Sequence, residues 1–337
     1  MRTLLARYPR LVTTLSRAEL YLRETPVETW LVSGTTVLVK RDDLSAPAVG
    51  GNKVRALELL LADVDPSRTL LTVGATGSTH ALAVARHGAS LGLRTEVITW
   101  PQEPHAVADA TAIRLGAIAE VTHARSVVDA YARSAMRRLS RRVHWVPAGG
   151  GVPLGALGHV DAALELVHQL ARDGFEVPDT IVVPLGTGGT AAGLLVGLAL
   201  AGVRTRVVGV RVVPRIVANR ARVLRLARRT HALLAYLSGE TLPLLHADRL
   251  VVQDDAYGGA YGRETTDARR AAEELRTAGG PPLDGTYSAK AFGVALERAR
   301  RAPDERVLFW LTFDGRWLAD DGAVVPSHSF TSRPSSR

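Results

Sequence analysis

The stretch Gly50-Gly51-Asn52-Lys53-Val54-Arg55 is the part of the sequence from which the fold is best predicted. Two glycines let the backbone approach a neighbouring group closely, because neither has a side chain. The next segment, 54–63, has apolar residues at helical spacing and predicts a helix. Lys53 is therefore expected at or near a helix start, where the helix dipole disfavours another positive charge and lowers the pKa of the amine.

A lysine with a lowered pKa is suited to carbonyl chemistry, because only the neutral amine forms a Schiff base. Composition favours this interpretation of Lys53. Only three of the 42 Lys and Arg residues are lysine, at positions 40, 53 and 290. Arginine supplies the rest of the positive charge, and arginine cannot form a Schiff base. From spacing alone, a surface lysine on a glycine turn remains the alternative.

Composition excludes several classes of protein. The 337 residues include no cysteine, which excludes disulfides, thiolate metal sites and a catalytic thiol. We expect no other metal site, because no group of His, Asp and Glu has metal-ligand spacing. The net charge of +9 fits anionic ligands better than nucleic acid, because aromatic residues make up only 5% of the chain.

The sequence also predicts a cytoplasmic protein without a membrane span. The N-terminus has no apolar segment followed by a cleavage site. The uncharged stretch 181–203 is long enough to cross a bilayer, but it contains Pro184 and a glycine-rich centre. That stretch is better explained as a strand, a loop and a helix.

Segments typical of strands alternate with helical segments along most of the chain. Strands are expected at 37–39, 70–73, 95–98, 118–121, 144–146, 180–183, 207–212 and 307–311. Helices are expected near 16–22, from about 78, and at 154–172, 215–238, 263–277 and 287–300. This alternation predicts an α/β fold of open parallel sheets with helices on both faces and ligands beyond the carboxyl strand ends. Otherwise 1–30 is expected to be irregular, and the tail 326–337 disordered.

The loop after the strand at 180–183 is a predicted phosphate site. It contains Gly186-Thr187-Gly188-Gly189-Thr190 and leads into a helix of small residues. Backbone N–H groups at a helix start, together with threonine hydroxyls, form an anion cradle. The spacing of Gly186, Gly188 and Ala191 also matches the dinucleotide fingerprint, although the acidic residue expected about 20 positions later is missing. An NADP-dependent reductase and a close-packed glycine turn are the alternatives.

Hydroxyl residues cluster after the strand at 70–73, in Gly74-Ala75-Thr76-Gly77-Ser78-Thr79-His80. Such a helix start suits a carboxylate, which hydroxyl and N–H groups would hold. Ser78 is a candidate to hold the substrate carboxylate or to move a proton. Ordinary capping of the helix by Ser78 or Thr76 is the alternative. On its own, His80 favours a structural role.

Further motifs complete a resemblance to a known family. They are Lys40-Arg41-Asp42-Asp43-Leu44, the stretch 149–158, and Asp284-Gly285-Thr286-Tyr287-Ser288-Ala289-Lys290. From about 38 to 312, the sequence resembles the pyridoxal-phosphate enzymes that include 1-aminocyclopropane-1-carboxylate deaminase and D-cysteine desulfhydrase. The resemblance implies pyridoxal 5'-phosphate and a tryptophan-synthase-β-like, fold-type-II architecture. It divides the chain into a large domain, 1–56 with 156–325, and a small domain, 57–155. We further expect a small amino-acid substrate and a homodimer.

The resemblance also implies roles for individual residues. Lys53 would bind the cofactor covalently, and the catalytic residues would be Lys53, Ser78, Tyr261 and Tyr287. Cofactor contacts would come from Asn52, Arg55, Thr79, Gly186, Thr187, Gly188, Gly189, Thr190, Ser288 and Thr312, and substrate contacts from Ser78, Thr79 and His80. The family usually has a second lysine at position 56, where this chain has alanine, and Arg55 is expected to replace that phosphate contact. Thr79 stands where the family has an asparagine, and Phe313 departs from the usual His-Thr-Gly-Gly ending.

The residue at position 288 predicts the type of reaction. In the resemblance, Ser288 faces the pyridine nitrogen, where ring-opening deaminases have glutamate and desulfhydrases have a hydroxyl residue. A carboxylate would keep that nitrogen protonated. A hydroxyl leaves it largely neutral, which gives a weaker electron sink suited to prompt loss of a β-leaving group. We therefore predict α,β-elimination; the alternatives are ring opening, β-replacement and a binding protein without turnover.

Overall fold

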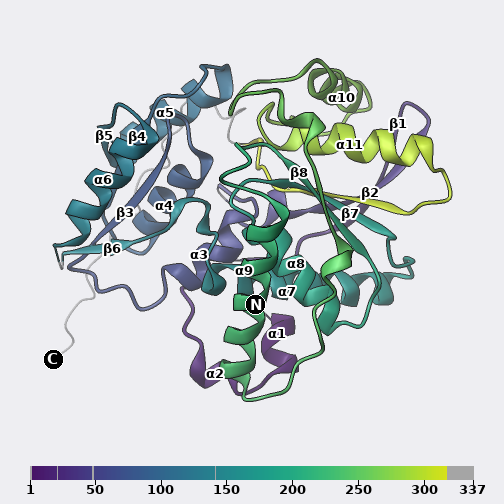
Figure 1. The fold of residues 1–337 in the computed structure, drawn as a ribbon, viewed down its shortest axis with the longest axis horizontal. Coiled ribbons are helices and arrows are strands. Elements are labelled where there is room, and N and C mark those ends of the chain that lie inside the picture. The colour runs from purple at the N-terminus through teal and green to yellow at the C-terminus, as the bar shows by residue number, and fades with distance from the viewer. Residues whose placement is uncertain (1, 21, 48, 141, 317–337) are drawn as a thin grey trace, which may run out of the picture.

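The computed structural model describes residues 2–20, 22–47, 49–140 and 142–316 and contains two sheets (Figure 1). The large sheet has the order β1-β2-β10-β7-β8-β9, and the small sheet the order β5-β4-β3-β6. All neighbouring strands are parallel except β1 and β2. The strands are β1 Val27–Val32, β2 Thr35–Arg41, β3 Thr69–Ala75, β4 Thr95–Trp100, β5 Glu120–His123, β6 Val143–Trp145, β7 Thr180–Leu185, β8 Arg206–Arg211, β9 Leu250–Gln253 and β10 Val307–Leu311.

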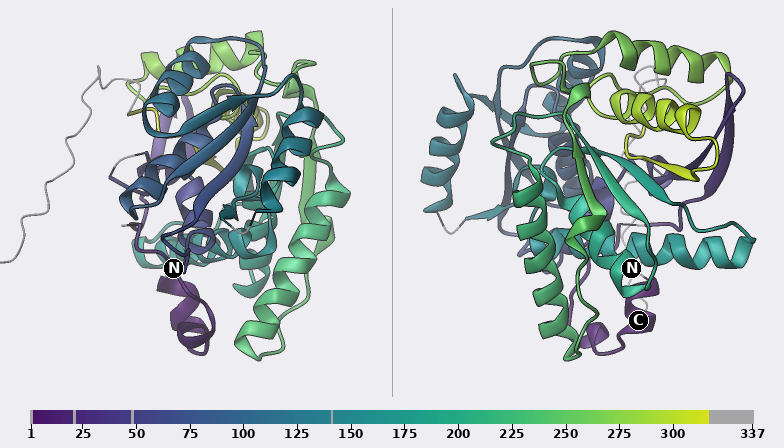
Figure 2. Two further views of the ribbon diagram at one scale, coloured as in Figure 1. Left: turned by 90° about the vertical axis from the view of Figure 1, so that its left-hand side faces the viewer. Right: turned by 45° about the vertical axis from the view of Figure 1, so that its right-hand side comes forward.

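The large sheet is covered on both faces, as is seen from its strands, in which alternate residues pack into two different hydrophobic cores. In β10, Leu308 and Trp310 pack into one core, whereas Phe309 packs into the other. Helices α7, α8 and α9 cover the first face, and α10 and α11 cover the second, as the views in Figures 1 and 2 show. Their bounds are α7 Pro153–Asp173, α8 Gly189–Leu200, α9 Arg220–Ser238, α10 Thr266–Thr277 and α11 Ser288–Arg301.

The small sheet is also packed between helices. Helix α4 packs against α3, α5 and strand β3, whereas α6 contacts strands β3, β4 and β6. The bounds are α3 Lys53–Leu60, α4 Thr79–Ser90, α5 Ala106–Ile118 and α6 Val127–Arg138. All four strands of this sheet fall within 57–155, while the domain boundaries themselves stay a prediction. In the described part of the chain, no helix has the length and apolar character needed to cross a membrane.

The predicted α/β fold with open parallel sheets is confirmed, but several local predictions are wrong. No helix forms at 16–20. Two short helices precede that segment, α1 Arg2–Arg7 and α2 Leu11–Thr14, and their residues Leu4 and Leu11 are buried against the α7–α9 layer. Strands β1 and β9 have no counterpart among the expected strands. Residue 118 ends α5 rather than beginning β5. The predicted disordered tail, 326–337, lies outside the described residues. Short 3-10 turns occur at η1 Asp42–Leu44, η2 Ala148–Gly150, η3 Ala247–Arg249 and η4 Asp255–Tyr257.

A buried network of charges joins β2, α3 and α7. The guanidinium of Arg55 donates to Asp42 Oδ1 at 2.7 Å and to Glu165 Oε1 at 2.9 Å. The ammonium of Lys40 also donates to Glu165 Oε1, at 2.6 Å, and both cations are fully buried. Trp310 of β10 donates its indole N–H to Asp42 Oδ2 at 2.8 Å. Two cations and two carboxylates thus neutralise one another between the large sheet and the helix that begins with Lys53.

This network corrects the expectation that Arg55 contacts the cofactor phosphate. Its three guanidinium nitrogens are directed to Asp42, Glu165 and Thr25, and the side chain has no exposed surface. The two carboxylates raise the pKa of Arg55 further above its ordinary range, against the opposing effect of burial. Arg55 therefore fixes α3 in place.

Replacing Arg55 by methionine should therefore destabilise the fold. Removal of one partner leaves buried carboxylates uncompensated, and we expect a loss of about 3–5 kcal/mol in the free energy of unfolding. Urea unfolding of the cofactor-free protein measures this loss. The exposed Arg172, which pairs with Glu24 at the surface, provides the matched control, and Arg172→Met should change stability by less than about 1 kcal/mol. Unchanged stability of Arg55→Met with a weakened phosphate affinity would instead support a phosphate contact.

Candidate active site

The glycines before Lys53 allow two backbone segments to touch. Gly51 has a φ of +95°, and a Cβ atom on it would lie 2.6 Å from the carbonyl oxygen of Thr312. The N–H of Asn52 donates to that same carbonyl at 3.1 Å. Gly50 donates its N–H to Asp314 Oδ2 at 2.8 Å. The turn is therefore attached to the end of β10, and a side chain at position 51 would prevent the contact.

Lys53 is the first residue of α3, as the sequence predicts, and two cavities meet at its side chain. Both cavities are lined by Asn52, Lys53, Tyr287 and Thr312. Burial lowers the pKa of Lys53 from its ordinary 10.5 to about 8, and the carboxyl of Asp284 partly opposes that shift. Desolvation is thus the main cause of the lowered pKa, and a usable share of the amine is neutral near pH 7 to 8.

The loop 186–190 forms a cradle at the start of α8. Gly188 has a φ of +90° and precedes the helix, whose first N–H groups have no partner within the helix. Gly151 lies so close to Thr187 that a Cβ atom would be 2.7 Å from its hydroxyl oxygen. Asn52 donates its side-chain amide to Thr190 Oγ1 at 2.8 Å. The residue before Lys53 therefore contacts the predicted phosphate cradle directly.

His159 of α7 is a neighbour of the cradle that the sequence interpretation missed. Its Nε2 lies 3.5 Å from Thr190 Oγ1, while its Nδ1 is buried without a hydrogen-bond partner among the described residues. Burial lowers the pKa of His159 to about 3, so the ring is neutral. A single histidine on a buried helix face gives no signal of its own, because its partner Thr190 lies 31 residues further along the chain.

Tyr261 and Tyr287 form a hydroxyl pair, of which Tyr287 lines both cavities at Lys53 and Tyr261 lines neither. Their hydroxyl oxygens are 2.8 Å apart, and their rings pack edge to face at 6.1 Å. Burial raises the pKa of Tyr261 to about 12 and raises the pKa of Tyr287 well above its usual value. Both hydroxyls are therefore protonated at neutral pH and can donate hydrogen bonds.

Asp284 is a second residue of the site that the sequence interpretation missed. Its carboxylate accepts the N–H groups of Tyr287, at 2.7 Å, and of Ser288, at 3.0 Å, and so caps α11. It also lines the cavity at Lys53, and burial raises its pKa. The order Asp284-Gly285-Thr286-Tyr287-Ser288 indicates this role, because an aspartate shortly before a helix start often accepts the N–H groups of the residues that follow it.

The three neighbouring residues Ser78, Thr79 and His80 have different surroundings in the structure. Ser78 is the N-cap of α4, and its Oγ accepts the N–H of Ala81 at 3.3 Å, so the capping alternative is observed. Thr79 lines the cavity at Lys53. The ring of His80 is buried, lies 3.5 Å from the Thr72 hydroxyl and lines neither cavity. The structure therefore gives no support to the His80 side chain as a substrate contact.

The residues at the site fit pyridoxal phosphate on two observations. The glycine cradle offers N–H groups at a helix start, which suits a phosphate. At the start of α11, Ser288 Oγ is fully buried and lies close enough to the Asp284 carboxyl to lower that group's pKa, but it forms no hydrogen bond of good geometry among the described residues, so it can pair with a polar atom of a bound group. Gly186–Thr190 would hold the phosphate, Lys53 the aldehyde carbon, and Ser288 with Thr312 the ring nitrogen.

A substitution in the cradle tests the phosphate assignment. Gly188→Val should raise the dissociation constant for pyridoxal phosphate by about a hundredfold, on the scale of one or two lost charge-assisted hydrogen bonds. Fluorescence titration of the cofactor-free protein measures it. Gly202, at the far end of α8, has a φ of +71° and open space around it, so Gly202→Val has similar backbone strain away from the site. Equal affinities of the two variants would refute the assignment.

Comparison with known proteins agrees with this geometry. The chain is 36% identical to a nocardicin C-9' epimerase of Nocardia uniformis subsp. tsuyamanensis, over 86% of this chain and 90% of the relative. It is 32% identical to a D-cysteine desulfhydrase of Serratia proteamaculans (strain 568), over 82% and 86%. The crystal structure of a homologue of the ACC deaminase superposes with a TM-score of 0.75 and 28% identity, over 93% and 95%.

The family described as pyridoxal-phosphate dependent enzyme matches residues 19–312. That match overturns the alternative of an NADP-dependent reductase, which left the stretch 50–53 unexplained. It also confirms the resemblance and the cofactor inferred from the motifs. The chain therefore belongs to the pyridoxal-phosphate dependent enzymes, and its cofactor is pyridoxal 5'-phosphate.

Proposed function

We propose that this enzyme catalyses α,β-elimination on a small amino acid and releases a 2-oxo acid, ammonia and the β-leaving group. Support for this choice comes from Ser288, whose hydroxyl is buried at the position that the resemblance places at the ring nitrogen. A neutral hydroxyl at the ring nitrogen does not favour its protonated form, in contrast to a carboxylate. The similarity to a D-cysteine desulfhydrase supports the same reaction class.

The side chains around Lys53 have the protonation states that such a reaction needs. Bound pyridoxal phosphate supplies an electron sink for charge that develops at the substrate Cα. Lys53, with a pKa of about 8, can take the Cα proton as a neutral amine near physiological pH. The hydroxyls of Tyr261 and Tyr287 stay protonated and can supply a proton to the leaving group.

Ser78 and Thr79 are proposed to hold the substrate carboxylate. Thr79 lines the cavity at Lys53, and Ser78 lies at the same helix start, where N–H groups and the dipole favour a negative charge. Helix α4 packs on the small sheet, whereas the turn that precedes Lys53 is attached to the segment just after β10 of the large sheet. Substrate would therefore be held between the two sheets. The predicted homodimer and cytoplasmic location are also proposals, consistent with the family resemblance.

Epimerisation at Cα is a second candidate, because the chain is 36% identical to an epimerase. Both reactions begin with removal of the Cα proton, and they differ in the next step. Elimination expels a β-substituent, whereas epimerisation returns a proton to the opposite face of the carbon. Elimination also competes with ring opening, β-replacement and binding without turnover.

The reaction is tested by supplying the holoenzyme with D-cysteine, β-chloroalanine and 1-aminocyclopropane-1-carboxylate in D2O. We expect oxo acid and ammonia from the two substrates with a β-leaving group. The variant Ser78→Ala should lose most of this turnover but little stability, because loss of a helix cap costs only about 1 kcal/mol in the free energy of unfolding. Release of oxo acid from the cyclopropane alone would contradict elimination. Deuterium at Cα with inversion and no oxo acid would establish epimerisation.

A further inference from the structure

The segment 258–263, here called the tyrosine loop, carries Tyr261 between η4 and α10. Three of its six residues are glycines with left-handed backbone: Gly258 at φ +74°, Gly259 at +86° and Gly262 at +84°. The loop belongs to no strand or helix. Its path is therefore set by contacts at its two ends rather than by its own backbone, and the position of the Tyr261 hydroxyl depends on those contacts.

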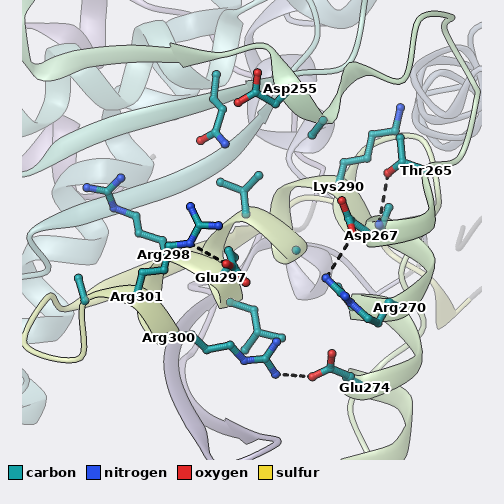
Figure 3. Close-up of a pocket in the computed structure, with 18 of the residues that line it drawn as sticks. Asp255, Thr265, Asp267, Arg270, Glu274, Lys290, Glu297, Arg298, Arg300 and Arg301 are labelled. Atoms are coloured by element: carbon teal, nitrogen blue, oxygen red, sulfur yellow. Dashed lines mark hydrogen bonds and ion pairs between the residues drawn. The ribbon is translucent and has the colours of Figure 1, made fainter.

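The first end is held by the large sheet. Lys290 of α11 donates its ammonium to the carbonyl of Tyr257 at 2.8 Å, and Arg211 of β8 lies over the Tyr257 ring at 4.7 Å from its centre. Lys290 is only 2% exposed and borders a cavity of about 680 Å³ between α10 and α11, where Figure 3 shows it beside Thr265. Four arginines of that cavity, Arg270, Arg298, Arg300 and Arg301, are already paired with carboxylates.

The second end is held by the small sheet. Arg263 donates Nε to both carboxylate oxygens of Glu103 at 3.2 Å and Nη2 to Glu103 Oε1 at 2.5 Å. Glu103 follows β4, whose last residue is Trp100. In the same segment, His105 Nε2 lies 3.2 Å from the hydroxyl of Thr286, the residue before Tyr287. Residues 101–105 thus contact both segments that supply the hydroxyl pair.

A contribution to the stability of the fold does not explain why Glu103 and Arg263 form an ion pair. Both side chains are about half exposed, and an exposed pair contributes little to the free energy of unfolding. Hydrogen bonding to Arg263 lowers the pKa of Glu103, so the pair is charged at neutral pH. The location of the pair distinguishes it from other surface pairs. It joins Glu103, which follows β4 of the small sheet, to Arg263, which lies two residues after Tyr261 and 160 residues after Glu103 in the chain.

We propose that Glu103 and Arg263 are positioning residues that hold the tyrosine loop against the small sheet and so place Tyr261 on Tyr287. The bidentate geometry fixes direction as well as distance. The proposal rests on the proposed function only for the choice of substrate, because the placement of the loop is a property of the chain itself. Contacts from the small sheet would then influence proton transfer, through the position of the Tyr261 hydroxyl, as well as substrate binding.

The test uses charge exchange across the pair. Glu103→Arg and Arg263→Glu should each speed hydrogen exchange at the amides of 258–263 in the cofactor-free protein by about two- to fivefold, the range available to an exposed pair. In the holoenzyme each should lower kcat for β-chloroalanine by a similar factor. The double variant should restore both values, because it rebuilds the pair with its charges exchanged.

Glu273 and Arg276 of α10 provide the matched control, because they also form an exposed bidentate pair, but within one helix. Reversal of their charges should leave exchange at 258–263 unchanged. Unchanged exchange in Glu103→Arg and Arg263→Glu, or a double variant that does not recover, would overturn the proposal. If β-chloroalanine is not turned over, the proposed function fails, and the exchange measurement still decides whether Glu103 and Arg263 hold the loop.

Discussion

The close contact between the Gly50-Gly51 turn and the end of β10 is the constraint on which the site depends. Asn52 donates its N–H to the Thr312 carbonyl, and no side chain fits at position 51. This contact places Lys53 at the first residue of α3, between the two sheets, and brings the Asn52 amide to Thr190 of the phosphate cradle. One turn thus joins the proposed covalent anchor of the cofactor to the loop that would hold its phosphate.

Desolvation is the main electrostatic effect in this pocket. It lowers the pKa of Lys53 to about 8 and raises those of Tyr261 and Tyr287, so a share of the Lys53 amine is neutral at a pH where both phenols are protonated. A separate network of paired charges, in which Arg55 and Lys40 neutralise carboxylates, lies behind α3. An amine that is partly neutral and protonated phenols near the reacting atoms, with paired charges behind them, fit a cofactor that itself supplies charge.

Local patterns predicted the fold and the place of Lys53 at a helix start because each signal lay within a few residues. The glycine turn, the cradle and the alternation of strands and helices were of this kind. The role of Arg55 was predicted wrongly because Glu165, one of its partners, is 110 residues away. The ion pair of Glu103 and Arg263 was missed for the same reason. The helix expected near 16–22 is absent at 16–20, where Ala18 and Leu20 are buried in a core and the Ala18 N–H donates to the distant Glu58 carbonyl, so tertiary contacts override the local preference.

The most direct test of the account is to identify the lysine that binds the cofactor. Borohydride reduction of the purified protein makes the attachment permanent, and digestion with trypsin followed by mass spectrometry locates it. The account predicts the label on the peptide 42–55, because Lys53 would no longer be cleaved. A label on Lys40 or Lys290, or a protein that retains no cofactor under reduction, would contradict it.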